Sequence, residues 1–294
     1  MYNVVGDDMK RLILIFVLSI MLCGCSQNEI YPPAIFESAP VEDVYVVFLS
    51  LDYGFCALAD IGDQNILIGC GESGDFPRIY EFLNEREVKA LDVVIFPSDF
   101  GVFTGGFQKL CANFEIGRLY IGNDTKNSDK YRGLMEVNSP SDGSIHIMNK
   151  GTRIYDKSGL TIDVLSSQLC VQDGKAQSAS TLLITYGKNT ILIEGNGDLK
   201  AEEQMEKEYP DMLKADVLSV PFGGTKAIPG RSFVDCVRPV YAVISAAGED
   251  YPDISLTRML EDAGCEVIRP DADGDVVFTL TDEGTEYHII KKGQ

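Results

Sequence analysis

The sequence predicts an α/β (α+β) protein, a four-layer αβ/βα sandwich of two mixed β-sheets with helices outside. The main observation is an internal repeat. The apolar strands that begin at Ile66 and Ile191 are each followed by an acidic helical stretch and then by a second strand, which begins at Asp92 or Asp216. The separations are 26 and 25 positions, and this shared spacing and order argue against chance similarity. Two halves that share the same order of strands and helices predict a pseudo-symmetric sandwich.

Hydrophobic periodicity places the individual elements. The expected strands are 44–51, 56–59, 65–68, 91–96, 181–186, 190–193, 240–245, 265–269 and 275–280. The expected helices are 76–88 and 255–263, and a turn is expected at 271–274. The strands 181–186 and 190–193 form a hairpin whose turn begins at Gly187. We find no linker long enough to divide this part of the chain, so we expect one domain over residues 44–290.

The N-terminus has the pattern of a targeting segment. Residues 1–25 are expected to be a lipoprotein signal peptide, and residues 26–43 a tether. A basic pair that begins at Lys10 precedes an apolar run too short to span a bilayer comfortably. The run ends in Leu-Cys-Gly-Cys, which resembles a lipobox, so we expect lipidation of Cys25 and attachment to the extracytoplasmic face of a bacterial cell membrane. An uncleaved anchor is the alternative.

The composition restricts the classes of partner. The formal net charge is -20, from 25 Lys and Arg against 45 Asp and Glu. Such a surface repels phosphates, so direct binding to nucleic acid is not expected. The expected partners are the membrane, through the lipid anchor, and an extracytoplasmic protein, peptide or glycan.

Six cysteines remain when Cys23 and Cys25 are set aside, and none has the C-x-x-C spacing of a zinc knuckle or thioredoxin-type motif. Cys56 and Cys70 lie on consecutive expected strands, so they are the pair that the sequence favours for a disulfide. For the other four, burial as small hydrophobic residues is at least as well supported.

The loop after the strand 91–96 is the most informative segment. An apolar strand leads into a polar break and ends at a Gly-Gly pair that opens a helix. This arrangement resembles the T-H-x-H-x-D-H-x-G-G loop of the metallo-β-lactamase superfamily, whose side chains hold two zinc ions. Counted back from Gly105, the three family histidines fall on Ser98, Phe100 and Phe103, and the aspartate falls on Val102.

Within that superfamily, residues 44–283 resemble the C-terminal domain of ComEC-type competence proteins. The family motif L-x-T-G-D, whose aspartate bridges both metals, aligns with Ile193-Glu194-Gly195-Asn196 and places Asn196 at the aspartate. The motif V-x-H-H-G-S aligns with residues 220–225 and places Gly223 at a histidine, whereas the C-terminal L-x-x-A-G-x-x-V is kept at residues 260–267. The resemblance therefore implies a metallo-β-lactamase-like domain that has lost its zinc ligands.

Those substitutions remove the donors that zinc requires. We therefore expect no zinc and no catalytic residue, and the degenerate positions are Ser98, Phe100, Val102, Phe103, Asn196 and Gly223. The first-loop side chains are expected to fill the former cavity as apolar core. The only histidines in the chain, His146 and His288, lie in alternating strand patterns where a structural role is expected.

Three functional hypotheses follow. The favoured one is a membrane-tethered, non-catalytic binding module outside the cell. The second is a hydrolase or nuclease with a remodelled metal site that holds Mg or Ca through carboxylates. Its candidate ligands are Asp52, Asp99, Asp198 and Asp216. The third is a DNA-uptake accessory that contacts other competence components without binding DNA.

Overall fold

The computed structural model describes residues 44–52, 54–62, 64–122, 145–172, 175–225, 228–245 and 251–291. All of them belong to the compact unit Ala39–Gln294. The expected signal peptide, the tether and Cys25 lie outside the described residues. Within the described ranges, no helix combines the length and the apolar character that crossing a membrane requires.

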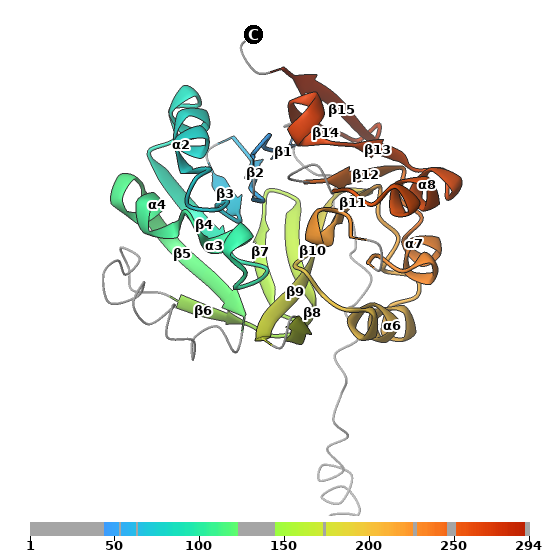
Figure 1. Cartoon of the computed structure of the whole chain (residues 1–294). Helices are drawn as coiled ribbons and strands as arrows, with labels where there is room; N and C mark the ends of the chain where they lie inside the picture. The colour runs from blue at the N-terminus through green and yellow to red at the C-terminus, as the bar shows by residue number, and fades with distance from the viewer. Residues whose placement is uncertain are drawn as a thin grey trace, which may run out of the picture. The chain divides into compact units, whose positions relative to one another are not determined.

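Two mixed β-sheets form the centre of the domain (Figure 1). The first sheet has the strand order β15 (Thr285–Ile290), β14 (Asp275–Leu280), β1 (Val44–Phe48), β2 (Ala57–Asp60), β3 (Asn65–Ile68), β4 (Ala90–Ile95), β5 (Glu115–Gly122) and β6 (Ile145–Met148). The second sheet has the order β13 (Glu266–Ile268), β12 (Tyr241–Ile244), β11 (Val217–Val220), β10 (Asn189–Glu194), β9 (Lys175–Tyr186), β8 (Leu160–Gln172) and β7 (Arg153–Lys157).

The pairing of the strands repeats between the two sheets. In the first sheet β3, β4, β5 and β6 run parallel, and Ile66 pairs with Val93. In the second sheet β10, β11, β12 and β13 run parallel, and Ile191 pairs with Val217. The remaining neighbours in both sheets are antiparallel. The internal repeat therefore predicted the topology correctly.

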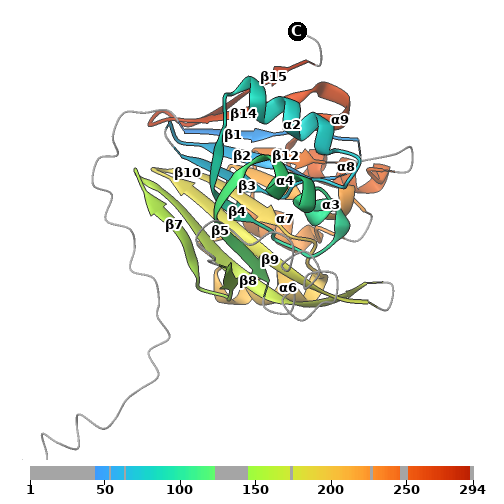
Figure 2. The same ribbon diagram turned by 90° about the vertical axis from the view of Figure 1, so that its left-hand side faces the viewer.

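The helices lie outside the sheets, which completes the predicted sandwich (Figure 1). The longer ones are α2 (Phe76–Glu85), α4 (Phe107–Asn113), α6 (Leu199–Glu208), α7 (Arg231–Val237) and α8 (Ile254–Asp262), and the short ones are α3 (Gly101–Thr104), η2 (Pro221–Gly223) and α9 (Pro270–Asp273). Figure 2 looks onto the side where α2 and α4 lie in front of strands of the first sheet. Helices α6, α7 and α8 lie on the opposite side of the domain.

The central strands are apolar on both faces because each face is covered. Ile66 and Ile191 belong to the core between the two sheets. Their neighbours Leu67 and Leu192 point to the other faces and pack in the cores under α2 and α4 and under α6, α7 and α8. Alternation of strand side chains thus builds three apolar layers from the same segments.

Some boundaries differ from those expected from the sequence. The helix predicted for 76–88 ends at Glu85, and Glu87 has a left-handed φ of 56° that a helix cannot continue through. The turn predicted at 271–274 is the short helix α9. The long hairpin of β8 and β9, which pairs from Leu160 with Tyr186 to Gln172 with Lys175, extends well beyond the strand predicted at 181–186.

Candidate functional site

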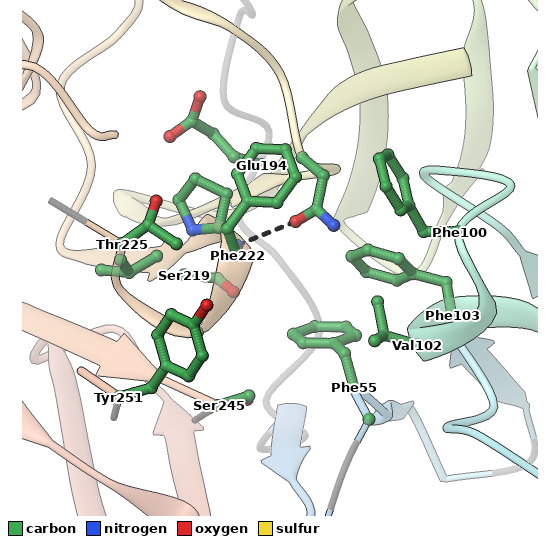
Figure 3. Close-up of a pocket in the computed structure, with 15 residues that line it drawn as sticks. Phe55, Phe100, Val102, Phe103, Glu194, Ser219, Phe222, Thr225, Ser245 and Tyr251 are labelled. Atoms are coloured by element: carbon green, nitrogen blue, oxygen red, sulfur yellow. Dashed lines mark hydrogen bonds between the residues drawn. The ribbon is translucent and has the colours of Figure 1, made fainter. Parts of the chain in front are cut away.

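A pocket of about 280 Å³ lies at the edge of the sheets where the parallel strands end (Figure 3). Its lining comes from the segments that follow β4, β10, β11 and β12. Phe55 joins them because it precedes β2, which runs antiparallel to β3. The carboxyl ends of parallel strands are the common position of ligand sites in sheets of this kind. This pocket is therefore the candidate site.

The loop after β4 is held by backbone contacts to both sheets. Pro97 accepts a hydrogen bond of 2.7 Å from the Ser180 N–H of the second sheet. Val102 and Phe103 carbonyls accept bonds of 2.9 and 2.8 Å from the N–H groups of Phe55 and Cys70 in the first. These contacts fix the direction of the side chains that the loop presents to the pocket.

Two glycines make this close approach sterically feasible. A Cβ atom on Gly106 would lie 2.3 Å from the Cys70 carbonyl oxygen. One on Gly195 would lie 2.5 Å from the carbonyl oxygens of both Pro97 and Ser180. Backbone atoms at such distances cannot move aside cheaply, so glycine is required at both positions: Gly106 within the first half, and Gly195 where the second half meets Pro97 of the first.

One wall of the pocket is formed by apolar side chains of the first half. Phe55 and Phe103 have ring centroids 5.2 Å apart, and Val102 lies beside them (Figure 3). Phe103 is only 3% exposed, as expected for core. Phe100 and Val102, however, are only partly buried and leave the pocket open. The expectation that these residues fill the former cavity is therefore wrong for two of the three: Phe100 and Val102 pack against the core but also line the pocket that remains.

The opposite wall rests on an unusual backbone. Asn196, Phe222, Gly223 and Gly224 all have left-handed φ, of 60°, 53°, 62° and 79°. The Asn196 Oδ1 atom accepts a 2.9 Å bond from the Phe222 N–H, which holds the two segments together. The Phe222 ring meets the Phe100 ring edge to face, with centroids 5.7 Å apart. A left-handed φ at a large aromatic residue is costly, so the surrounding contacts must stabilise this position of Phe222.

The structure brings together most of the degenerate positions predicted from the sequence. Those that line the pocket are Phe100, Val102, Phe103, Asn196 and Gly223. Ser98 does not: it is fully buried, and its Oγ donates a 2.8 Å bond to the Ser178 carbonyl. Ser98 is therefore a link between the sheets and not part of the pocket surface.

The donor set in the pocket does not fit a dinuclear zinc centre. Phenyl, isopropyl and glycyl groups offer no lone pair to a metal, and Asn196 Oδ1 is already bonded to Phe222. Among the residues that the structure describes, no group of three or more His, Cys, Asp and Glu side chains is placed to hold a metal ion.

The candidate ligands of a remodelled metal site do not converge either. Asp99 Oδ1 accepts a 3.0 Å bond from the Ser178 N–H, and Asp198 Oδ1 caps α6 by accepting from the Ala201 N–H at 2.9 Å. Asp52 is exposed and lies outside the pocket lining. Asp216 precedes β11 and accepts from the Thr190 N–H at 2.7 Å, so it lies at the strand end away from the pocket. The prediction that Asp216 is a candidate ligand beside the other three acids is therefore wrong.

The cysteines and histidines lie outside the pocket lining as well. Cys56 and Cys70 are separate buried thiols, so the favoured disulfide is not formed in this structure. The Cys70 Sγ donates to the Phe103 carbonyl at 3.3 Å. His146 stacks on Tyr120 at 4.8 Å in the first sheet, and His288 pairs with Val277 in β15. Both histidines are strand residues, as expected.

Two buried acids lie behind the second wall. Glu194 ends β10, lines the pocket and is 1% exposed, and neither of its carboxylate oxygens has a hydrogen-bond partner among the residues that the structure describes. Glu202 of α6 is also 1% exposed; its Oε2 accepts a 2.8 Å bond from the Gly230 N–H, and its Oε1 has none. Burial raises the pKa of Glu194 well above its ordinary value, and the nearby Glu202 raises it further. Burial also raises the pKa of Glu202 to about 7, against the lowering effect of the Gly230 N–H.

Among the lining residues that the sequence did not predict, four carry large or acidic side chains: Phe55, Glu194, Phe222 and Tyr251. The sequence contained a signal for one of them, Glu194. An acid directly after the apolar run that forms β10 is unusual, because a charged group at a buried strand end is costly without a partner. Phe55 and Tyr251 reach the pocket only through tertiary contacts between distant segments, which no local pattern reports.

No family model matches the chain. Two curated relatives are similar in sequence. ComE operon protein 3 of Bacillus subtilis (strain 168) is 24% identical over 200 residues, which are 67% of this chain and 26% of that protein. Competence protein ComA of Neisseria gonorrhoeae is 23% identical over 266 residues, which are 87% of this chain and 35% of that protein. The chain thus spans about a quarter to a third of these relatives.

Solved structures identify the fold. The metallo-β-lactamase fold protein YhfI from Bacillus subtilis superposes with a TM-score of 0.57 at 13% identity, covering 80% of this chain and 99% of that chain. Zn(2+)-bound PqqB from Methylobacterium extorquens superposes with a TM-score of 0.55 at 11% identity, covering 76% of this chain and 97% of that chain. The chain has the metallo-β-lactamase fold and is similar to competence proteins, as its motifs predicted.

Proposed function

We propose that this metallo-β-lactamase-fold domain is a non-catalytic binding module that takes a ligand in the pocket lined by Phe55, Val102 and Phe103 on one side and by Phe222 and Tyr251 on the other. The observation that supports this most directly is the pocket itself. The pocket persists at the positions that align with the metal ligands of the superfamily, but its walls are aromatic. A concave, mostly apolar pocket with a few polar groups is the usual form of a small-ligand site.

Hydrolysis lacks the groups that it would need. A zinc hydrolase uses the metal to lower the pKa of a water molecule toward neutrality, and the side chains here supply no ligand set for that metal. The carboxylates of Asp99 and Asp198 are engaged with backbone N–H groups of Ser178 and Ala201. No contact in the described residues favours the remodelled hydrolase or nuclease.

The proposed location is the extracytoplasmic face of a bacterial cell membrane, with the chain tethered through a lipid on Cys25. The signal-like N-terminus supports this, and the similarity to competence proteins supports a membrane-associated, accessory role. The net charge of -20 disfavours direct contact with nucleic acid. The proposed partner is therefore an extracytoplasmic molecule other than DNA or RNA. Mass spectrometry of the mature N-terminus tests the anchor: a product without acyl chains on Cys25 would contradict it.

Metal content and turnover test the absence of catalysis. We expect the purified protein to contain no stoichiometric zinc and to hydrolyse neither phosphodiesters nor lactams. Elemental analysis and the two activity assays on the same preparation measure this. Stoichiometric zinc together with turnover that is lost on chelation would refute the proposal.

Ligand binding tests the pocket. A screen of small compounds by thermal shift should find molecules that raise the melting temperature of the wild type. The Val102→Trp variant, which fills the pocket, should lose that shift. Val240→Trp is the matched control, because Val240 is 51% exposed and lies outside the lining. A shift of equal size in Val102→Trp would place the ligand elsewhere.

A further inference from the structure

The pocket is unusually rich in aromatic rings for its size. Five of its lining residues are aromatic: Phe55, Phe100, Phe103, Phe222 and Tyr251. Figure 3 shows the first three on one side of the pocket and the last two on the other. The face of an aromatic ring carries negative charge, so rings around one space attract a cation of low hydration.

Two acidic side chains near the aromatic rings also favour a positively charged ligand. Glu194 lines the pocket with both carboxylate oxygens unpartnered, and Glu202 adds a third unpartnered oxygen nearby. The Glu194 carboxylate points away from the three phenylalanines of the other wall (Figure 3), and burial favours its protonated form, so it acts on the pocket only when a bound cation draws it into its charged form. A cation in the pocket would compensate a buried negative charge for which the described residues provide no partner.

The remaining polar groups set the limits on the ligand. Ser219, Ser245 and Thr225 supply hydroxyl groups, and the lining residues that the structure describes include no lysine or arginine. The net charge of -20 raises the concentration of cations near the surface and repels anions. An inorganic divalent ion is a poor occupant, because it needs several oxygen ligands and the aromatic walls offer none. The ligand therefore combines positive charge with an apolar surface.

We propose that the pocket is an aromatic cage for a methylated ammonium group. This inference rests on the proposed binding function and specifies the ligand class. The group disperses one positive charge over methyl groups, which fit against phenyl rings and lose little hydration. A pocket of about 280 Å³ is close to the lower end of the usual range for ligand pockets, as suits a headgroup of a few heavy atoms.

Calorimetry with two probes of one shape tests the charge requirement. The first probe is choline, and the second is the neutral alcohol in which carbon replaces its quaternary nitrogen. We expect choline to bind about tenfold more tightly than the neutral alcohol, since shape and apolar surface are matched. Equal affinities would overturn the cage and leave a simple apolar pocket, in which case the proposed binding function survives. Binding of neither probe would also overturn the cage, and the compound screen with Val102→Trp then decides the binding function separately.

Variants locate the interaction. Phe100→Leu keeps apolar volume but removes a ring, so it should weaken choline binding about fivefold and leave the neutral alcohol unchanged. Tyr80→Leu is the control, because Tyr80 is an aromatic residue 40% exposed on α2, outside the lining. An equal loss with both probes in Phe100→Leu would indicate packing alone and would overturn the cation interaction.

A second pair of variants tests the acid. Glu194→Gln removes, at constant shape, the group that a bound cation would draw into its charged form, and it should weaken choline binding several-fold. Glu203→Gln is the control, because it removes an acid at an exposed position of α6. An unchanged affinity in Glu194→Gln would overturn the role of the buried acids.

Vesicles of phosphatidylcholine, added as competitors for bound choline, then identify the source of the methylated ammonium group. Displacement indicates a lipid headgroup and its absence a free molecule, and either result supports the ammonium chemistry.

Discussion

The two halves of the domain share one topology but differ in the hydrogen bonding of the acids buried beside α2 and α6. In the first half, Asp75 precedes α2 and is 5% exposed; it accepts hydrogen bonds from the N–H groups of Asp52 at 3.2 Å and Glu72 at 2.8 Å. In the second half, Glu194 and Glu202 flank the equivalent turn into α6 and are each 1% exposed. Together they have three carboxylate oxygens for which the described part of the chain offers no hydrogen-bond partner.

This difference distinguishes a buried acid with a structural role from a pair of buried acids that the fold alone does not explain. A buried carboxylate that accepts backbone N–H bonds fixes a loop and contributes to stability. A buried carboxylate without a partner destabilises the folded state, unless it takes up a proton or a ligand cation. The first acid is therefore explained by the fold alone. The second pair is not, and a cation bound in the pocket beside it is the explanation that we propose.

Removal of the structural acid should have the largest effect. Asp75→Ala leaves two backbone N–H groups without their acceptor and should lower the free energy of unfolding by about 4 kcal/mol. Urea denaturation measures the change. Glu81→Ala is the control, since the Glu81 side chain is 64% exposed on the same helix and makes only a long ion pair of 4.0 Å. A loss below about 1 kcal/mol in Asp75→Ala would remove the contrast between the two halves.

Removal of Glu194 and Glu202 should instead raise the free energy of unfolding, and the size of this effect should depend on pH. The pKa of Glu202 rises from 4.5 in the unfolded chain to about 7 in the folded protein, because burial disfavours the charged form. The folded state then binds more protons, so this contribution to stability is complete below pH 4.5 and is lost as the pH rises through about 7. The loss is roughly 3 kcal/mol for a shift of this size.

A double variant isolates that contribution from the other carboxylates. Glu194→Gln with Glu202→Gln removes both titrating groups at constant shape. Its free energy of unfolding should exceed that of the wild type at pH 8, and the difference should shrink toward pH 4.5. Denaturation with urea across this range measures it. A difference that stays constant with pH would show that the pair does not titrate in the folded protein.

The repeat and the loop motifs allowed much of this architecture to be predicted. The order around Ile66 and Ile191 gave the parallel pairs with Val93 and Val217, because apolar runs of equal spacing can be placed in equivalent sheets. The positions of Phe100 and Asn196 converged on one pocket because glycines and backbone contacts fix the loops that carry them.

The rest depended on tertiary distances that no local pattern contains. The approach of Glu202 to Glu194 follows from the packing of α6 and from the Gly230 N–H, 28 positions along the chain from Glu202. Tyr251 reaches the pocket from the segment that precedes α8. Whether Phe100 would close the cavity depended on where the other lining segments place their side chains, and this is a property of the assembled sandwich.

The smallest predicted effect concerns Ser98, which joins the two halves. Its Oγ donates to the Ser178 carbonyl at 2.8 Å and accepts only a long bond of 3.4 Å from the Phe100 N–H. Ser98 is fully buried and lies outside the pocket lining. Ser98→Ala should therefore lower the free energy of unfolding by about 1 kcal/mol, the usual contribution of one neutral buried hydrogen bond. Ligand affinity should stay unchanged, because the pocket surface is untouched. Ser232→Ala, which removes an exposed hydroxyl that donates to Glu206, is the control for stability. If Ser98→Ala altered affinity and left stability unchanged, Ser98 would belong to the site after all, as the aligned family histidine does.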